Sequence, residues 1–537
     1  MSKLSNSPSF LKEFLTTLFI IILTPPFSIL IFLILFLVIL PCSIYRRLVD
    51  FIAHTLDPDM GKLLCGMSAA QNRDFDILNV KPYSSQVVCF RLTGTTKFEQ
   101  FRETLSQRIL ERLDPTQPYN PTLQYPELRQ YLTTFMGYAF LKKDKNFDFN
   151  NHCTYLKRPS NDPLTRKELS KLWESEIIAP YPKRRSPWHV TVIDNYLPTE
   201  KETECWTKNV EGYKKGDHVW VALLRIHHSL ADGFAVQKML SYLADEPYVP
   251  KFSIKTTAFQ NFMLGLRTGI LGSYDALTRF IRWTDPFNTL HIPSDKQSHE
   301  YFIVESDLIS MKQVKAIKEK FGVAFTAILV AAISGGFRKF LVKHKRPIPS
   351  FISTGIPFTD PDHTSKFDNR FSIATIGLAV HVDDPKERVL YVKNQFNLIL
   401  STSWIKLLEI TVNALSCLPI RLFRFVSQSS LFSSVYSTQP GPDKCLPAIG
   451  GKLLEVNFAF GTGSDSLGFG LSSVTYNKHF RFVMFMEKNL LEGDKEQAEE
   501  LISYITDELD VLEKYNSSKP EVEDEKVQRW KDSIKND

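Results

Sequence analysis

The chain has 537 residues, of which 43% are hydrophobic, and it includes 40 phenylalanines. This length exceeds what one ordinary hydrophobic core accommodates, so we expect two or more globular units. The formal charge of +6 arises from 65 basic and 59 acidic residues that are well interspersed, which argues against a nucleic-acid-binding footprint. The seven cysteines are scattered and form no C-x-x-C pair, which disfavours a disulfide framework or structural zinc and favours a reducing compartment.

The first predicted element is a membrane segment at the amino terminus. Residues 14–45 contain no charged residue and no histidine, and the apolar run from Leu18 to Leu40 reaches the length of about 20 residues that crosses a bilayer. Pro25 and Pro26 lie inside this run, and paired prolines bend or break a helix. Two alternatives stay open: one kinked span, or a helical hairpin that enters and leaves on the same side. Basic residues flank both ends, so the charge pattern does not orient the segment.

Residue periodicity then predicts an α/β unit. Strands and amphipathic helices alternate at residues 86–92, 96–113, 187–196, 218–228 and 234–246. Residues 256–298 contain no clear strand and are expected to form a helical connector.

A second α/β unit of similar design is predicted after the connector. Its strands and helices are expected at residues 300–307, 308–322, 326–344, 349–358, 373–382, 452–460, 480–491 and 495–515. The predicted organisation is therefore an anchor (1–60), a first domain (61–255), a connector (256–298), a second domain (299–515) and a charged tail (516–537).

One apolar segment of the second unit has two interpretations. Residues 403–426 have helical periodicity and carry Lys406, Arg421 and Arg424. The segment either packs on the second unit or lies as a basic amphipathic helix on the same membrane as the anchor.

The residues that suggest chemistry are in "RIHHSLADGF", where the strand 218–228 ends. Adjacent residues on a strand point in opposite directions, so His227 and His228 are expected to have different roles. His228 is the candidate general base, because imidazole is the side chain best suited to accept a proton at neutral pH. Asp232 is expected to cap the following helix or to hold the loop by a salt bridge, and Gly233 is expected to permit the turn.

Other kinds of site fit this segment less well. A buried histidine with a capping aspartate is the structural alternative, and a His-His-Asp metal site is disfavoured because no third clustered ligand is visible. The sequence contains no G-x-S-x-G elbow, P-loop or G-x-G-x-x-G motif, which argues against a serine hydrolase of that type and against nucleotide binding.

Together with three further segments, this motif resembles a known family. These segments are "FDFNNHC" (147–153), "RRSPWHVTVID" with Pro187 and Trp188, and "STQPGP" (437–442). The combination resembles the chloramphenicol-acetyltransferase-like acyltransferase superfamily, and within it the wax ester synthase/acyl-CoA:diacylglycerol acyltransferase (WS/DGAT) family.

The resemblance implies a fold and a reaction. The expected fold is two α/β sandwich domains that face a central channel, in addition to the membrane helix or hairpin. The expected reaction is O-acyl transfer from acyl-CoA to a long-chain fatty alcohol, which gives a wax ester, or to diacylglycerol, which gives triacylglycerol. His228 would deprotonate the alcohol, with His227 and Asp232 beside it and Gly233 as a structural residue. Neither a metal nor a cofactor is implied, and acyl-CoA acts as co-substrate.

The resemblance also suggests residues around the channel. Ser437 and Thr438 are candidates for oxyanion donors or positioning residues, although Pro-Gly-Pro also simply makes a tight turn. Pro187 and Trp188 are expected to shape the channel wall. Thr326 is a further candidate and lies where bacterial members carry an Asn-Asp pair, so this chain departs from the family pattern in the second domain.

Membrane attachment fits the expected chemistry, because lipid alcohols partition into bilayers whereas coenzyme A is soluble in water. The resemblance therefore predicts an enzyme of the endoplasmic reticulum membrane, a lipid droplet or the plasma membrane, with its catalytic part in the cytosol. The alternative is a membrane-anchored lipid-binding or scaffolding protein that keeps the fold without activity.

Overall fold

The computed structural model describes residues 33, 36–95, 98–158, 162–246, 248, 296–360, 363, 366–427, 432–461 and 467–515, with scattered residues between 257 and 292. Most of the predicted membrane segment, and the predicted tail, lie outside these residues. The final part of the apolar run is described, and residues 36–56 are helical. Much of the predicted connector is also outside the described residues.

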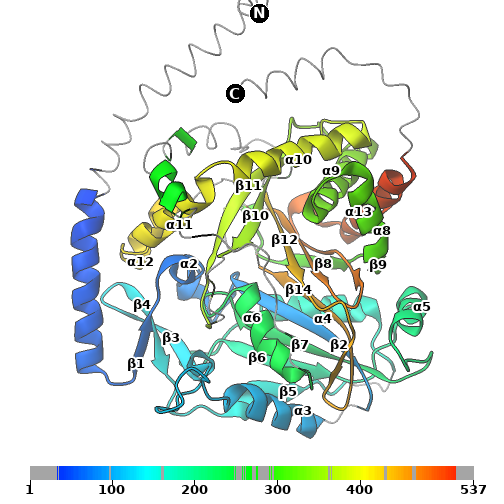
Figure 1. Ribbon diagram of the computed structural model, residues 1–537. Coiled ribbons are helices and arrows are strands. Elements are labelled where there is room, and N and C mark those ends of the chain that lie inside the picture. Colours follow the sequence, from blue (N-terminus) through cyan, green and yellow to red (C-terminus); the bar gives the residue numbers. More distant parts are fainter. Residues whose placement is uncertain are drawn as a thin grey trace, which may run out of the picture.

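The first α/β unit is built on a mixed six-stranded sheet in the order β13-β14-β2-β7-β6-β5. Figure 1 shows this sheet in the lower half of the molecule. Its strands are β2 (Ser85–Thr93), β5 (Cys153–Tyr155), β6 (Trp188–Ile193), β7 (Val219–His227), β13 (Leu446–Ala448) and β14 (Gly451–Phe460). A smaller antiparallel sheet beside it contains β1 (Met60–Leu63), β3 (Gln130–Phe135) and β4 (Tyr138–Lys143).

The two faces of the first sheet have different cores because alternate residues of each strand point to opposite sides. One face packs under α3 (Phe98–Leu105), its continuation 106–110 and α6 (Gly233–Leu240). The other face packs against α4 (Arg166–Ile177), α5 (Glu200–Asn209) and residues of the second sheet. The predicted strands and helices of this unit are confirmed, with boundaries that differ by a few residues.

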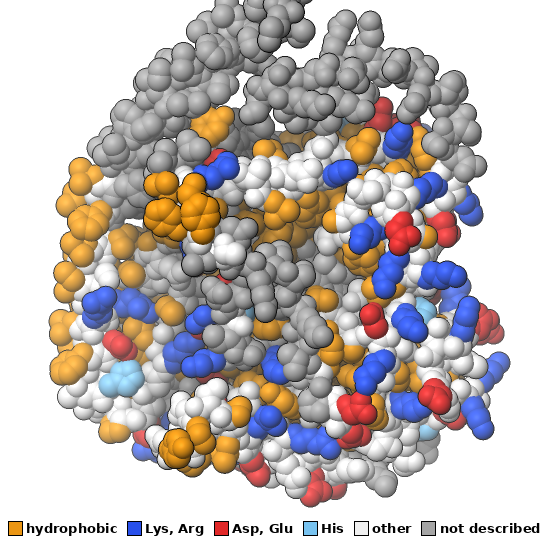
Figure 2. Space-filling view, in the orientation of Figure 1, with side chains coloured by type: hydrophobic (Ala, Val, Ile, Leu, Met, Phe, Trp, Pro, Cys, Tyr) orange, Lys and Arg blue, Asp and Glu red, His pale blue; other side chains and the backbone are white. Residues whose placement is uncertain are grey.

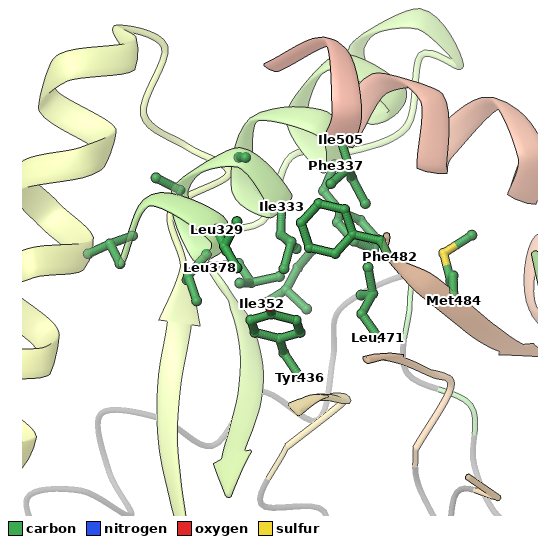
Figure 3. Packing of buried hydrophobic residues seen from close by; sticks show 14 of the residues in the cluster. Leu329, Ile333, Phe337, Ile352, Leu378, Tyr436, Leu471, Phe482, Met484 and Ile505 are labelled. Carbon is green, nitrogen blue, oxygen red and sulfur yellow. The ribbon is translucent and has the colours of Figure 1, made fainter. Parts of the chain in front are cut away.

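The second unit contains a six-stranded sheet in the order β11-β10-β12-β15-β17-β8. These strands are β8 (Tyr301–Glu305), β10 (Ile352–Thr359), β11 (Phe371–Leu378), β12 (Ser434–Pro440), β15 (Phe469–Thr475) and β17 (Val483–Glu487). The helices packed on it are α8 (Met311–Phe321), α9 (Phe325–Lys343), α10 (Pro385–Leu400) and α13 (Lys495–Lys514), and β9 (Ile309–Ser310) pairs with β16 (His479–Phe480). Figure 3 shows the resulting core, in which Leu329, Ile333 and Phe337 of α9 face strand residues such as Leu471.

Helix α9 is a core helix despite its apolar composition. Among the described helices, it is long and apolar enough to cross a membrane, and so is the bent pair of α10 and α11 (Trp404–Leu415) if the two count as one segment. However, 72% of the apolar window of α9 is buried inside the protein. Burial of most of this window explains its hydrophobic sequence without a bilayer.

The strand predicted at residues 452–460 belongs to a different sheet from the one expected. We expected it in the second unit, but as β14 it pairs antiparallel with β2 of the first unit, from Leu453 opposite Leu92 to Phe460 opposite Gln86. Apolar alternation predicts that a segment is a strand but not which strand is its partner. The second half of the chain therefore completes the first sheet, and the two units are physically interlocked.

A buried ionic cluster also joins the units. Arg91 of β2 and Arg481, which precedes β17, are fully buried among Glu202, Glu305 and Glu455. Arg91 Nη2 lies 2.6 Å from Glu305 Oε2, and Arg481 Nη2 lies 2.7 Å from Glu202 Oε1. Although burial alone would raise the pKa of Glu202, the charges of Arg481 and Arg91 lower that pKa to about 2. The Glu202 carboxylate therefore stays ionised, and removing one of its arginine partners would leave an uncompensated buried charge.

The segment predicted as one helix at residues 403–426 is two helices. α11 is followed by α12 (Ile420–Ser427), and Pro419 immediately precedes the second helix. Proline removes a backbone donor and starts a helix readily, which accounts for the break. α11 packs against α2 (Gly66–Ala70) and β11, whereas α12 exposes several apolar side chains.

Candidate active site

His228 lies at the carboxyl end of β7, in the turn that leads to α6. Its backbone N–H donates to the carbonyl of Ser84, 2.7 Å away, which holds the turn against β2. Every residue of β7 is buried, so the strand is a rigid support for the turn. The helix begins at Gly233 because Asp232 caps it, with its carboxylate accepting from the Ala235 N–H at 2.9 Å.

His227 points away from His228 and has both ring nitrogens occupied. Nε2 lies 2.9 Å from Asp74 Oδ1 and Nδ1 lies 2.7 Å from Ser229 Oγ, in a fully buried site. Asp74 also accepts from the backbone N–H groups of Tyr83 and Ser84. Burial would raise the pKa of Asp74, but the histidine and these hydrogen bonds lower it. His227 therefore anchors the end of the strand, which is the packing role expected for one of the two rings.

The ring of His228 is oriented by Asn369, which lies just before β11 in the second unit. Asn369 Nδ2 donates to the His228 carbonyl at 2.7 Å and to Ser68 Oγ at 3.1 Å. Its Oδ1 therefore faces the ring, 3.0 Å from His228 Nδ1. An amide oxygen is an acceptor only, so Nδ1 carries the proton and Nε2 carries a lone pair. Burial lowers the pKa of His228, which favours the neutral base at neutral pH.

Asp232 acts on this site through the backbone of the second unit. Beyond its capping bond, it accepts from the Arg370 N–H at 2.8 Å and faces His363 Nε2 at 3.0 Å. Its own N–H donates to the Asp368 carbonyl at 3.2 Å. These contacts hold the residues on both sides of Asn369 against the turn, so the structure places Asp232 as a positioning residue.

Gly233 makes room for the segment "STQPGP" at the end of β12. A Cβ on Gly233 would lie 3.2 Å from Gln439 Nε2, which is a tight contact. Gln237 of α6 donates to the Pro440 carbonyl at 2.7 Å, so a hydrogen bond holds the end of β12 against α6. At Gly441 a Cβ would lie 2.2 Å from the Thr475 carbonyl, and only glycine fits this close approach.

The other residues singled out in the sequence do not all meet at His228. Ser437 is buried, and Thr438 Oγ1 accepts from Ser473 Oγ at 3.0 Å. Among the described residues, neither hydroxyl has a hydrogen bond to His228. Thr326 lies in the first turn of α9. Within the described part of the chain, no hydrogen bond links it to the motif.

Pro187 and Trp188 connect two of the predicted motifs by packing. The Pro187 carbonyl accepts from the His227 N–H at 2.9 Å, which places the pair beside the histidine turn. Trp188 Nε1 donates to the Leu128 carbonyl at 2.8 Å, and its ring stacks on His152 with centroids 4.6 Å apart. His152 in turn stacks on Phe147. The segments at 147–153 and 187–188 therefore form one cluster that supports the strand ends.

Asn369 and Ser68 were missed by the sequence analysis. Asn369 is 141 residues from His228, and Ser68 lies in the short helix α2. No spacing rule connects positions so far apart, and the only local signal was a polar "DN" directly before an apolar strand. In the described part of the chain, no three His, Cys, Asp or Glu side chains are grouped as a metal site would require.

Solved structures share this architecture. The chain superposes on a wax ester synthase/diacylglycerol acyltransferase from Marinobacter aquaeolei VT8 with a TM-score of 0.54 and 16% identity, over 82% of this chain and 97% of that one. It superposes on the starter condensation domain of rhizomide synthetase RzmA, a mutant in complex with C8-CoA and Leu-SNAC, with a TM-score of 0.53 and 9% identity, over 85% and 95%. The protein thus has the mixed α/β fold of condensation domains and related acyltransferases, and the predicted fold is confirmed to that extent.

Comparison of sequences narrows the class of acyltransferase to which the chain is similar. Residues 367–513 match the WS/DGAT C-terminal domain family. The chain is 23% identical to a putative diacylglycerol O-acyltransferase of Mycobacterium tuberculosis over 47% of this chain and 55% of that protein. It is 21% identical to the O-acyltransferase WSD of Acinetobacter baylyi over 47% and 56%. The chain matches about half the length of these relatives, and its predicted resemblance to the WS/DGAT family is confirmed.

Proposed function

We propose that this protein is an O-acyltransferase that moves a fatty acyl group from acyl-CoA to a lipid alcohol, either a long-chain fatty alcohol or diacylglycerol. The observation that carries the proposal is the His228–Asn369 pair, which fixes a neutral imidazole with Nε2 available as a base. The names of the curated relatives, which include diacylglycerol O-acyltransferase and O-acyltransferase, agree with this class of enzyme.

The proposed reaction is a direct transfer. His228 Nε2 takes the proton of the alcohol hydroxyl as the oxygen attacks the thioester carbonyl carbon. The tetrahedral intermediate then collapses, the carbon–sulfur bond breaks, and the coenzyme A thiolate takes up the proton from the imidazolium. Asn369 Oδ1 accepts from Nδ1–H throughout and stabilises the positive charge that develops on the ring.

The test is ester synthesis by membranes that contain the protein, supplied with labelled acyl-CoA and either hexadecanol or diacylglycerol. We expect an ester with at least one acceptor and loss of product in His228→Ala. His218→Ala is the matched control, because His218 is a partly exposed histidine that pairs with Asp194 and makes no contact with the motif turn. Wild-type protein without product would favour the inactive lipid-binding alternative, and full activity in His228→Ala would refute the mechanism.

We also propose that the protein is attached to a membrane and that its catalytic part faces the cytosol. The uncharged run at residues 14–45 overlaps the first half of the helix at 36–56. The outward side chains of this helix include Phe36, Ile44 and Phe51, which are 58%, 61% and 70% exposed. Figure 2 shows hydrophobic side chains along the edge of the molecule where Figure 1 draws this helix. Exposed apolar surface on this scale is costly in water and is typical of a membrane-facing or partner-facing surface.

The α12 helix extends this surface. Ile39 and Cys42 of the helix 36–56 pack against the cluster of Leu418 and Phe423, so the two helices adjoin. On the outer side of α12, Phe425 is 74% exposed. This arrangement supports the membrane interpretation of α12, whereas α11 packs on the second unit.

The topology of the anchor has its own test. Protease accessibility of an amino-terminal tag in sealed microsomes should distinguish the two arrangements of residues 14–45. Protection of the tag while the catalytic part is digested indicates a single span, and cleavage of both indicates a hairpin.

A further inference from the structure

The residue that precedes Asn369 makes its own contacts with the candidate site. Asp368 Oδ1 accepts hydrogen bonds from the Asn369 N–H and from Ser68 Oγ, both at 2.9 Å. The backbone carbonyl of Asp368 accepts from the Asp232 N–H at 3.2 Å. Asp368 is therefore bonded both to the residue that orients the ring of His228 and to the aspartate of the motif turn.

The second oxygen of the Asp368 carboxylate faces a lysine from the first half of the chain. Lys62 Nζ, on β1, lies 3.0 Å from Asp368 Oδ2, and the two side chains are 35% and 19% exposed. Water and salt screen a partly buried pair less than a fully exposed one. Burial would raise the pKa of Asp368, but the charge of Lys62 and the hydrogen bonds to the carboxylate lower it. Asp368 is therefore ionised at neutral pH, with one oxygen turned to Lys62 and the other to Ser68 and Asn369.

Glu127 is a second carboxylate whose charge interacts with Lys62. Burial raises the pKa of Glu127 to about 7, and the charges of Lys62 and Asp368 act on this pKa in opposite directions. The charge of Lys366 also lowers it. Around neutral pH, Glu127 is therefore partly protonated, whereas Asp368 stays ionised. Asp368 is thus the constant anionic partner of Lys62.

The backbone around Lys62 is held by the elements that flank it. β1 pairs antiparallel with β4. Met60 packs in one cluster with residues of the helix 36–56, and Arg46 of this helix donates from Nη2 to the Leu64 carbonyl at 2.9 Å. Positions on both sides of Lys62 are thus fixed. An ion pair costs less conformational entropy when the backbone that carries it is already ordered.

From these contacts we propose that Lys62 is a positioning residue for the proposed base. Its ammonium group holds the Asp368 carboxylate, Asp368 holds the backbone of Asn369, and Asn369 holds the His228 ring. Lys62 acts through this series of contacts and not by contact with the reacting atoms. The inference rests on the proposed function, and it adds to the site a residue from the strand that follows the helix 36–56.

Lys62→Met is the first test, because methionine keeps much of the apolar stem of lysine and removes its charge. The Asp368 carboxylate then lacks its cationic partner and turns toward water or another donor, which loosens its hold on Asn369. We expect kcat to fall about three- to tenfold, as when a partly buried ion pair is lost. KM should change less than kcat, because the base is misplaced while the substrate contacts are kept. Lys62→Arg keeps the charge and should recover most of the lost kcat.

Lys142→Met is the matched control. Lys142 lies on β4 of the same sheet, forms an ion pair with Asp57 and is 28% exposed, close to the 35% of Lys62. The control therefore removes the same charge from the same sheet, and its kcat should stay within about twofold of wild type. A purely structural role of Lys62 predicts that the two variants behave alike. Equal losses of kcat in both, or an unchanged kcat in Lys62→Met, would overturn the proposal.

A double-mutant cycle tests the route by which Lys62 acts. If Lys62 acts through Asn369, then Lys62→Met should change kcat by less than about twofold in the Asn369→Ala background, because the residue that it positions is already absent. Losses that multiply in the double variant would show that Lys62 acts by another route, and they would contradict the proposal.

Hydrogen–deuterium exchange of the full-length protein separates this inference from the proposed reaction. The backbone N–H groups of Asn369 and Asp232 both donate to Asp368, so loss of Lys62 should free them to exchange. Peptides that contain these two N–H groups should exchange about three times faster or more in Lys62→Met, and at the wild-type rate in the control variant. If the wild type makes no ester but this difference in exchange is observed, the proposed function fails and the assignment of Lys62 stands. Unchanged exchange in Lys62→Met refutes the assignment, whether or not ester is formed.

Discussion

Replacement of Asn369 provides the sharpest test of how the base is held. Asn369→Ala removes the acceptor of Nδ1–H and both hydrogen bonds from Nδ2. A hydrogen bond to a charged group contributes about 1.5–3 kcal/mol, and the imidazole becomes charged in the transition state. Because about 1.4 kcal/mol corresponds to a tenfold change in rate, kcat should fall about 10- to 100-fold, with a smaller change in KM.

The pH profile separates this role from a purely structural one. The hydrogen bond that His228 Nδ1–H donates to Asn369 Oδ1 raises the pKa of His228, so Asn369→Ala should lower that pKa further and move the acid limb of kcat/KM to lower pH. Asn369→Asp keeps an acceptor and adds a negative charge, so its acid limb should move to higher pH. Ser68→Ala is the control: it removes one partner of Nδ2 and the hydrogen bond from Ser68 Oγ to Asp368, but it leaves the acceptor of His228 Nδ1–H in place and should have a weaker effect. A kcat within about twofold of wild type in Asn369→Ala, or acid limbs that do not move, would refute the reasoning.

Four further predictions follow from other parts of the molecule. Since burial lowers the pKa of His228, kcat/KM of the wild type should stay constant from neutral pH down to about 6.5 and fall only at lower pH. A midpoint above pH 7 in the pH–rate profile would contradict the lowered pKa. The pKa of Glu202 is lowered to about 2, so its contribution to stability is complete above the ordinary pKa of 4.5 and is lost as the pH falls toward 2. The free energy of unfolding, measured with denaturant between pH 7 and pH 3, should therefore depend less on pH in Glu202→Gln than in the wild type. An identical pH dependence in both proteins would count against the buried cluster. Gly441→Ala should lower the free energy of unfolding by about 1–3 kcal/mol, because the new methyl group meets a carbonyl of β15, and wild-type thermal stability would show that the close approach is wrong. When Phe425→Cys carries a polarity-sensitive fluorophore, the fluorescence emission should shift to the blue in vesicles, whereas the emission of a label on the exposed Val342→Cys should not. Equal emission spectra with and without vesicles at position 425 would exclude α12 from the membrane surface.

Local patterns in the sequence were sufficient to predict most of the regular structure. The strands at 86–92 and 218–228 and the long helices at 326–344 and 495–515 are close to their observed bounds, because periodicity reports which face of a segment is buried. The strands β1, β3, β4, β5, β12 and β15 and the helix α10 were not predicted. The strand at residues 452–460 was predicted but assigned to the wrong unit, because pairing between distant strands leaves no local signal.

The candidate site was predictable only in part. Strand alternation predicted different surroundings for His227 and His228, and the structure gives the two rings different partners, whereas the role of His228 as the base stays a prediction. The role of Asp232 was expected to be a helix cap or a loop contact, and the structure shows both. Asn369 could not be found, because its link to His228 joins the two halves of the chain.

The sequence by itself determined the alternation of strands and helices, the histidine turn with its capping aspartate, and the apolar segment at residues 14–45. Each of these depends on interactions among residues a few positions apart. The tertiary structure decided which tautomer of His228 is held and which strand completes the first sheet. Each of those depends on contacts between β2, β7 and α6 from the first half and β11, β12 and β14 from the second half, and such contacts form only when the chain folds.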